Sequence, residues 1–193
     1  MHLVSRLREK EEEALIQLMN VYGDYLLRTA VLLVNDHQTA EELVQDTFII
    51  AFEKINQLED VTKMKGWLTA IIINACRAKM RKWSWKNIFP RMDIVNHAEK
   101  GDSTDDPEEI VLQLFQHQHL SELIQQLDYK YREVITLFYF NDMKINDISK
   151  QIKINENTVK SRLTRGRVLL KALLEKGEVN YERTEQKNKQ TAP

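Results

Sequence analysis

The sequence is poor in residues that break helices and in the residue that cross-links chains. Its 193 residues include five glycines, three prolines and a single cysteine, Cys76. One cysteine cannot form a disulfide within the chain and argues against a thiolate zinc site, so we expect Cys76 to be a buried structural thiol. No apolar run approaches the roughly 20 residues that a membrane-spanning helix requires, and no signal peptide is evident. We therefore expect a soluble, cytoplasmic protein.

The sequence also lacks the usual signatures of catalysis. It contains no glycine-rich phosphate-binding loop and no Glu-x-x-His pair of the kind that holds metal in helical bundles. His117 and His119 are two residues apart, so on a helix they point in different directions. We therefore predict that the protein is not an enzyme and that it holds no metal and no cofactor.

Apolar residues at helical spacing dominate what is present. Hydrophobic residues make up 42% of the chain, and few glycines or prolines interrupt the pattern, which predicts an all-α fold. We predict two small helical domains, an N-terminal helical bundle over residues 1–89 and a C-terminal helix-turn-helix domain over residues 110–175. Residues 90–109, PRMDIVNHAEKGDSTDDPEE, are polar and acidic and predict a flexible linker. Residues 176–193 are polar and predict a disordered tail.

The net charge of −1 conceals an uneven distribution of charge. Residues 1–60 carry 5 basic and 12 acidic side chains, whereas residues 61–92 carry 8 basic side chains and no acidic one. Residues 93–128 carry 1 basic and 9 acidic side chains, and residues 129–176 carry 11 basic and 5 acidic ones. Two basic blocks, each beside an acidic one, favour two nucleic-acid contacts over an ordinary solvated surface.

The N-terminal domain is expected to present one acidic and one basic helix. Thr39, with Glu42 three residues later, predicts a capping box that starts a long helix. The buried face of this helix is expected to consist of Leu43, Val44, Thr47, Phe48, Ala51 and Ile55. A polar loop is expected over residues 56–65. A further helix is predicted to begin near Gly66 and to end in a basic segment that contains Arg77, Lys79, Arg81 and Lys82.

The strongest local signal is a helix-turn-helix between Lys144 and Leu174. A short amphipathic helix is followed by a break at residues 153–155, where Asn155 is a good N-cap for a second helix. The inward stripe of the second helix is predicted to be Val159, Leu163, Gly166, Leu170 and Leu173. Gly166 permits a close approach of the neighbouring helix.

The opposite face of the second helix favours DNA reading over a merely solvated basic surface. A helix that enters the major groove needs short polar groups for base edges and cations for phosphates. Such groups are present at Asn157, Lys160, Ser161, Thr164 and Arg165.

Several segments together resemble the extracytoplasmic-function sigma factors, the group IV specificity subunits of bacterial RNA polymerase. TVKSRLTRGR at residues 158–167 resembles their recognition helix. AEELVQDTF at residues 40–48 resembles their polymerase-binding helix, and GWLTAIIINACRAKMRK at residues 66–82 resembles the helix that follows it. The resemblance covers nearly the whole chain outside the linker and tail. It implies a transcription initiation factor that binds core RNA polymerase, directs it to specific promoters and melts the minus-ten element.

The resemblance implies three sets of contact residues. Those that dock on the clamp helices of the large polymerase subunit are Glu41, Glu42, Leu43, Gln45 and Asp46. Those near the minus-ten element are Leu58, Lys63, Lys65, Trp67, Asn74, Arg77, Lys79, Arg81 and Lys82. Those at the minus-thirty-five element are Asn157, Thr158, Lys160, Ser161, Arg162, Thr164, Arg165 and Arg167. For Trp67, core packing and DNA contact are equally open interpretations, and Trp83 and Trp85 either stack on bases or pack.

The resemblance also implies the partners. These are promoter DNA, core RNA polymerase with its clamp helices and flap, and an anti-sigma factor, often membrane-anchored, that holds the protein inactive. No small-molecule substrate is implied. The acidic linker either enters the polymerase channels or is a plain tether. The main alternative is a stand-alone helix-turn-helix regulator, which has no use for a second basic block behind an acidic helix.

Three residues depart from the habit of the family. Lys153 occupies a turn position that is usually Gly, and a left-handed conformation there costs roughly 1 kcal/mol. Lys144 replaces a usual Ser N-cap of the first helix of the motif. Leu58 stands where an aromatic residue is common near the minus-ten loop.

Overall fold

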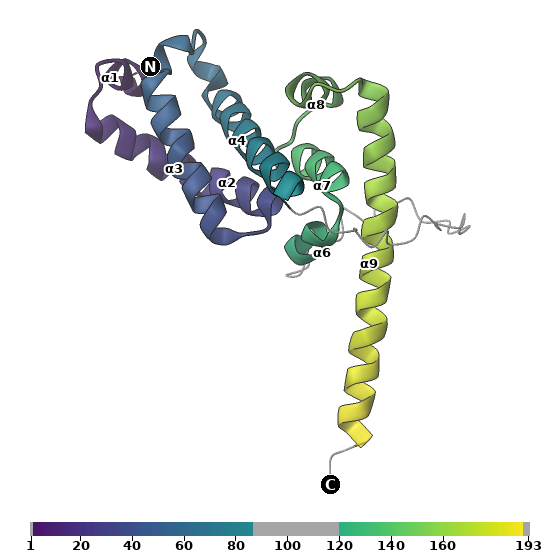
Figure 1. Ribbon diagram of the computed structural model, residues 1–193. Helices are drawn as coiled ribbons and strands as arrows, with labels where there is room; N and C mark the ends of the chain where they lie inside the picture. The colour runs from purple at the N-terminus through teal and green to yellow at the C-terminus, as the bar shows by residue number, and fades with distance from the viewer. Residues whose placement is uncertain (1, 87–119, 191–193) are drawn as a thin grey trace. The chain divides into compact units, whose positions relative to one another are not determined.

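The computed structural model of the protein describes residues 2–86 and 120–190, and the regular secondary structure in these residues is entirely helical (Figure 1). No strand occurs in these residues, which confirms the predicted all-α fold. The chain divides into two compact units, residues 1–94 and 95–193, which are described separately below. The predicted linker, residues 90–109, lies outside the described residues, as do the side chains of Trp83 and Trp85.

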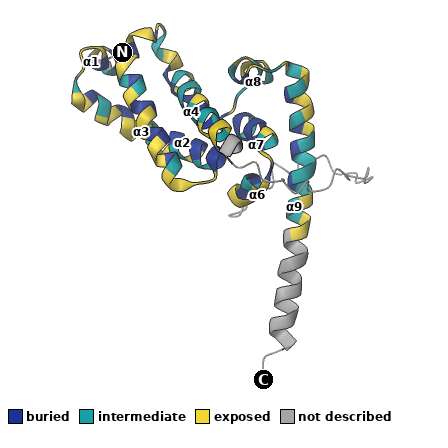
Figure 2. Cartoon of the chain, viewed as in Figure 1, coloured by how far each residue is buried: buried dark blue, intermediate teal, exposed yellow. Residues whose placement is uncertain are grey.

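The N-terminal unit is a helical bundle. It contains α1 (His2–Arg8), α2 (Glu12–Val34), α3 (His37–Glu53) and α4 (Met64–Lys86), with two 3₁₀ turns, Ile55–Gln57 and Val61–Lys63, between α3 and α4. Helices α2, α3 and α4 pack against one another, and α1 packs against α2. Their inward stripes are buried and their outward faces exposed (Figure 2). Fully buried side chains of this core include Leu18, Leu26, Leu33, Leu68, Ile72 and Cys76, so the expected burial of the cysteine is confirmed.

The start of α3 differs from the prediction. The N-cap is Asp36, whose carboxylate accepts a hydrogen bond of 2.7 Å from the backbone N–H of Thr39, and α3 begins at His37. Thr39 therefore lies inside the first turn, and the predicted capping box at Thr39 and Glu42 is wrong. Asp at the N-cap satisfies a backbone N–H that the helix itself leaves unpaired.

The C-terminal unit holds the helix-turn-helix. It contains α6 (Leu120–Gln126), α7 (Tyr129–Ile135), a π-helical turn (Thr136–Phe140), α8 (Ile145–Ile152) and α9 (Glu156–Gln190). Helix α9 packs against α6, α7 and α8 (Figure 1). A Cβ atom at Gly166 would lie 3.0 Å from Cγ1 of Ile135, so the predicted close approach at this glycine is confirmed.

The turn between α8 and α9 follows the sequence prediction. Lys153 adopts a left-handed conformation with φ 56° and ψ 48° and ends α8. Asn155 caps α9, because its Oδ1 accepts hydrogen bonds from the backbone N–H and the Oγ1 of Thr158, at 2.7 and 2.8 Å. Lys144, at the N-cap of α8, forms no side-chain capping bond.

Helix α9 is longer than expected. Its backbone is helical as far as Gln190, whereas the sequence predicted a disordered tail from Lys176 onward. Residues 177–190 contain one glycine, Gly177, and no proline. The segment is rich in Glu, Gln, Lys and Arg, which have good helix propensity, so nothing local ends the helix at Lys176.

Candidate nucleic-acid interface

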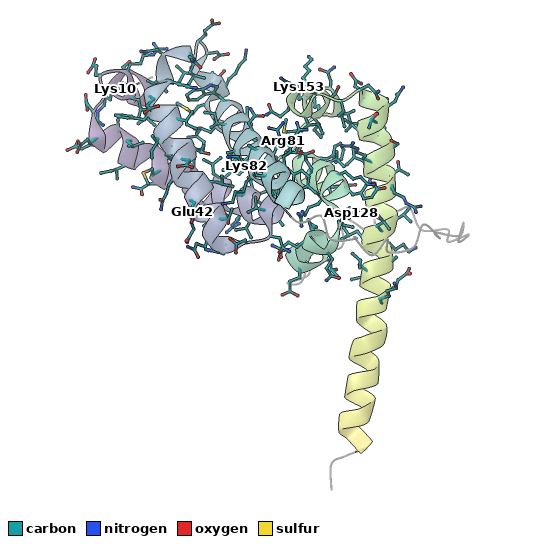
Figure 3. The ribbon with its side chains drawn as sticks, in the orientation of Figure 1. Lys10, Glu42, Arg81, Lys82, Asp128 and Lys153 are labelled. Atoms are coloured by element: carbon teal, nitrogen blue, oxygen red, sulfur yellow. The ribbon has the colours of Figure 1, made fainter. Side chains whose placement is uncertain are left out.

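The basic end of α4 presents one polar face. Its other side supplies Leu68, Ile72, Ile73 and Cys76 to the core. Trp67, Asn74 and Arg81 are spaced by seven residues, or two turns, and so share one side of the helix. Asn74, Arg81 and Lys82 are exposed, whereas Trp67 and Arg77 are half-buried. Figure 3 labels Arg81 and Lys82 at this end of α4.

Two of the predicted DNA-binding lysines lie against neighbouring helices instead. The Nζ of Lys79 is 3.8 Å from Oε2 of Glu42 on α3. The Nζ of Lys65 lies 4.5 Å from the ring centroid of Tyr25 on α2. Both lysines are exposed as whole residues, so these contacts orient the ammonium groups without removing them from water. The structure therefore separates Lys65 and Lys79 from the face that carries Asn74 and Arg81.

The loop between α3 and α4 buries one predicted site residue. Leu58 is only 4% exposed and packs into the core of the unit. This side chain is thus not available for direct contact with DNA, contrary to the sequence interpretation. The exposed side chains of the loop include Asn56, Gln57, Glu59 and Lys63. Asn56 and Gln57 were missed, although amide groups, which both donate and accept hydrogen bonds, suit the recognition of base edges.

The outward face of α3 is mainly acidic and has one exposed apolar residue at its C-terminal end. Glu41, Glu42, Gln45 and Asp46 are exposed, as the sequence predicted. Ile49 is 54% exposed and lies one helical turn beyond Gln45 and two turns beyond Glu42. Sequence reasoning missed Ile49, although its spacing from Glu42 places it on the same stripe.

Leu43 points the other way. It is 8% exposed and belongs to the inward stripe of α3. Its assignment to the docking surface is therefore replaced by a role in the core, which its position in the apolar periodicity also predicted. The outward face of α3 then consists of the carboxylates, Gln45 and Ile49.

The exposed face of α9 carries most of the predicted minus-thirty-five residues. Asn157, Lys160, Ser161 and Thr164 are exposed, and Thr158, Arg162, Arg165 and Arg167 are half-buried. The hydroxyl groups of Ser161 and Thr164 donate to the backbone oxygens of Thr158 and Lys160, both at 3.1 Å. Their oxygen lone pairs remain available as acceptors. The helix thus offers acceptors beside cations, as a groove-reading surface requires.

Arg167 has a structural contact within the unit. Its Nε donates to the Oη of Tyr139 at 2.6 Å, and its guanidinium carbon lies 5.8 Å from the ring centroid of Phe138. Both aromatic residues belong to the π-helical turn, Thr136–Phe140. Arg167 therefore ties α9 to this turn, and any contact with DNA competes with that bond.

The described residues form neither a membrane-spanning helix nor a cluster of metal ligands. No helix among residues 2–86 and 120–190 combines the length and the apolar character needed to cross a membrane. In the same part of the chain, no three His, Cys, Asp or Glu side chains converge in a way that would hold a metal ion.

Two protein-family models match the chain. Residues 18–86, from α2 to the end of α4, match the model described as Sigma-70 region 2. Residues 117–170, which include α6 to α8 and the first half of α9, match Sigma-70, region 4. Together the two matches cover well over half of the sequence.

Named relatives cover nearly the whole chain. The ECF RNA polymerase sigma factor SigW of Bacillus subtilis is 23% identical over 176 residues, which span 89% of this chain and 94% of SigW. SigM of the same species is 27% identical over 161 residues, which span 83% of this chain and 95% of SigM. Among solved structures, the sigma factor RpoE of Bartonella quintana, in complex with the anti-sigma factor NepR, matches with a TM-score of 0.60 and 26% identity. That match covers 82% of this chain and 95% of RpoE.

Proposed function

Since the chain belongs to the sigma-70 family of transcription initiation factors, we propose that it is a specificity subunit of the extracytoplasmic-function type, in group IV. The observation that carries this proposal is the presence of region 2 and region 4 in one chain, in that order. SigW and SigM, which match over most of their own length, are both named ECF RNA polymerase sigma factors. The protein acts by binding and placing DNA and polymerase, with no catalytic step of its own.

Core RNA polymerase is the proposed partner of α3. Glu41, Glu42, Gln45 and Asp46 form an exposed, mainly acidic row on α3, and Ile49 lies at the C-terminal end of that row. Such a row complements a basic helical surface such as the clamp helices of the large subunit, because opposite potentials steer and orient association. Ile49 adds an exposed apolar side chain that a partner can bury. The flap of polymerase is the proposed partner of the C-terminal unit.

The minus-ten element is the proposed ligand of α4 and of the loop before it. Arg77, Arg81 and Lys82 neutralise phosphates, while Asn74 and Trp67 lie on the same side of the helix near the bound strand. An unpaired base of the non-template strand enters at the loop, so that binding energy offsets the cost of unstacking it. Lys63 adds a cation at this loop.

The minus-thirty-five element is the proposed ligand of the exposed face of α9. The N-terminal turns of this helix enter the major groove, and the residues there divide into two kinds. Asn157, Ser161 and Thr164 contact base edges, and Lys160, Arg162 and Arg165 contact phosphates or guanine. Thr158 stays largely committed to the cap formed by Asn155.

An anti-sigma factor is the proposed regulator, and the cytoplasm is the proposed site of action. RpoE of Bartonella quintana was solved with such a factor, and a membrane-anchored relative of that kind would hold this chain at the inner face of the membrane. The acidic linker, residues 90–109, is proposed either to enter the polymerase channels or to act as a tether.

Run-off transcription tests the proposal. Purified full-length protein is mixed with core polymerase and fragments of the source genome, and transcripts are sequenced. We expect a small set of start sites that share upstream sequences and appear only when both proteins are present. A gel shift without polymerase separates the alternative, because a stand-alone regulator binds duplex promoter DNA unaided. Transcripts that are independent of the added chain would contradict the proposal.

A further inference from the structure

The loop between α3 and α4 is held from outside by two cations at the end of α1. Nη2 of Arg8 donates to the backbone oxygen of Leu58 at 2.8 Å. The Nζ of Lys10 donates to the backbone oxygen of Phe52 and, at 3.3 Å, to that of Glu53. Lys10, labelled near α1 in Figure 3, also lies 4.8 Å from the ring centroid of Phe52. The two cations thus hold the main chain on both sides of the turn Ile55–Gln57.

Helix physics explains why cations are placed at these points. The last carbonyl groups of a helix have no partner inside it, and the C-terminal end carries partial negative charge. Phe52 and Glu53 are the last two residues of α3. Lys10 therefore donates hydrogen bonds to unpaired carbonyl groups and also places a positive charge at the negative end of the helix. Leu58 ends the following turn, where Arg8 supplies the corresponding donor.

The segment that carries the two cations is itself braced. Nε of Arg6 donates to Oε2 of Glu11 at 2.6 Å, and its Nη2 donates to Oε2 of Glu13 at 3.1 Å. Lys10 is in the left-handed region with φ 63°, which turns the chain sharply from α1 into α2. From the other side, Ile55 and Leu58 anchor the loop in the core. The main chain of the loop is therefore fixed both from inside and from outside.

Three polar side chains of the loop remain exposed. Asn56, Gln57 and Glu59 alternate with the anchored positions and are exposed. Because the neighbouring main chain is held, the direction in which each of these three side chains leaves the backbone is set before any ligand arrives. A site that is preorganised in this way loses less conformational entropy on binding.

We propose that Arg8 and Lys10 are positioning residues that hold the loop of residues 54–63 in the shape that receives an unpaired DNA base. The inference rests on the proposed function, because the ligand of the loop is the non-template strand of the minus-ten element. It extends that function to α1, which lies outside the residues matched to region 2, 18–86.

The test compares full-length Arg8→Met and Lys10→Met with the wild type, each bound to core polymerase. The probe is a fluorescent single-stranded DNA with the non-template minus-ten sequence of a promoter found by run-off transcription. We expect Arg8→Met to weaken binding of this strand about tenfold, because it removes a charge-assisted hydrogen bond to the loop. Affinity for core polymerase and for a duplex minus-thirty-five fragment should stay at the wild-type level, which a general loss of folding would not allow.

Arg28→Met is the matched control. It removes the same charge from an exposed residue of α2, outside the loop, and should retain wild-type strand affinity. Arg8→Lys should recover part of the loss. Unchanged strand binding by both variants overturns the inference, as does a loss that falls equally on strand, duplex and polymerase binding. If the wild-type complex itself binds no strand, the proposed function fails first, which the wild-type measurement shows separately.

Discussion

Lys153 adopts an unfavourable backbone conformation that forms the turn between α8 and α9. It adopts φ 56° and ψ 48° where α8 ends, and a side chain with a Cβ atom is strained in that region relative to glycine. Its backbone N–H still bonds to the oxygen of Ser149, so the turn closes in the usual way. The turn sets the angle at which α9 leaves α8 and hence the presentation of the reading face.

Replacing Lys153 with glycine should therefore stabilise the C-terminal unit. We expect Lys153→Gly to raise its free energy of unfolding by about 1 kcal/mol, because the strain is relieved by more than the added entropy of the unfolded chain. Urea unfolding followed by circular dichroism measures the change. A lower midpoint in the variant would show that the left-handed turn is not under strain.

Gly166 and Gly23 should respond in opposite ways to alanine. At Gly166 the new methyl group meets the fully buried Ile135 at 3.0 Å, whereas at Gly23 nothing lies within 4 Å. Overpacking costs about 1–3 kcal/mol, while alanine gains about 1 kcal/mol in helix propensity. We expect Gly166→Ala to lower the melting temperature and Gly23→Ala to raise it. Equal shifts in the two variants would refute close packing at Gly166.

At the scale of elements, α3 joins the two proposed surfaces of the N-terminal unit. Glu42 on the outward face of α3 lies within 3.8 Å of Lys79 on α4. Exposed pairs of this kind contribute little to stability, and Lys79 lies off the face of α4 that carries Asn74 and Arg81. The pair therefore links the helix proposed to bind polymerase to the helix proposed to bind DNA, without itself belonging to the DNA face.

The cap of α3 should make stability depend on pH. Hydrogen bonding from Thr39 lowers the pKa of Asp36 below its ordinary value. A carboxyl whose pKa is lower in the folded state stabilises that state above its unfolded pKa of about 3.9, and this contribution is lost as pH falls through the lowered value. Asp36→Asn keeps a capping side chain without a charge. We expect the stability advantage of the wild type over Asp36→Asn to shrink between pH 5 and the acid limit, as followed by thermal melts; an advantage independent of pH would refute the charged cap.

Helices and turns were predictable from the sequence where the spacing of apolar residues and a capping or turn residue indicated the same boundary. The α8–α9 turn and the cap at Asn155 follow from such signals, and both are present. The start of α3 was misplaced because Asp36 and Thr39 are both acceptable caps, and only the backbone conformation chooses between them. Local signals also gave no reason for α9 to continue past Lys176, since its charged residues are compatible with helix and with disorder.

The helices that carry the candidate site were predictable from the sequence, but which of their side chains are exposed was only partly predictable. Leu58 was placed near DNA because its position corresponds to a contact position in the family it resembles, yet tertiary packing buries it. Burial of the charged pair Arg132 and Glu133, at 5% and 2% exposure, was not predictable either. Nη1 of Arg132 donates to the backbone oxygen of Gln125 at 2.8 Å, and Oη of Tyr129 donates to Glu133 at 3.1 Å. The contact with Gln125 depends on how α6 and α7 pack, whereas Tyr129 and Glu133 lie one turn apart within α7. What the sequence could not give is the burial of both charged side chains.

At the scale of the whole molecule, the acidic and basic blocks of the sequence correspond to particular helix faces. The acidic residues of the first block include the outward face of α3, and the first basic block ends α4. The second basic block includes the exposed face of α9. Two basic helices from different units are proposed to bind two parts of one promoter, each supplying part of the affinity. Linkage through a chain raises the effective concentration of the second contact once the first has formed.

Arg165 tests whether α9 reads sequence. If its guanidinium contacts a guanine with two hydrogen bonds, Arg165→Ala should weaken binding of polymerase complexes to the cognate upstream element by about 1–3 kcal/mol. Lys176→Ala, an exposed residue farther along the same helix, is the charge-matched control. Competition binding with mutated upstream elements gives the measurement. An equal loss on every upstream sequence would assign Arg165 to the phosphates.

We propose above all that this chain works as a subunit of RNA polymerase and not alone. Size-exclusion chromatography of purified full-length protein with core polymerase that lacks its own specificity subunit measures this directly. We expect the chain to elute with polymerase in equal molar amounts, and a charge reversal at Glu42 and Asp46 together to abolish co-elution while the variant remains helical. If the wild-type chain elutes separately from polymerase at every salt concentration that preserves its fold, it is not a polymerase subunit.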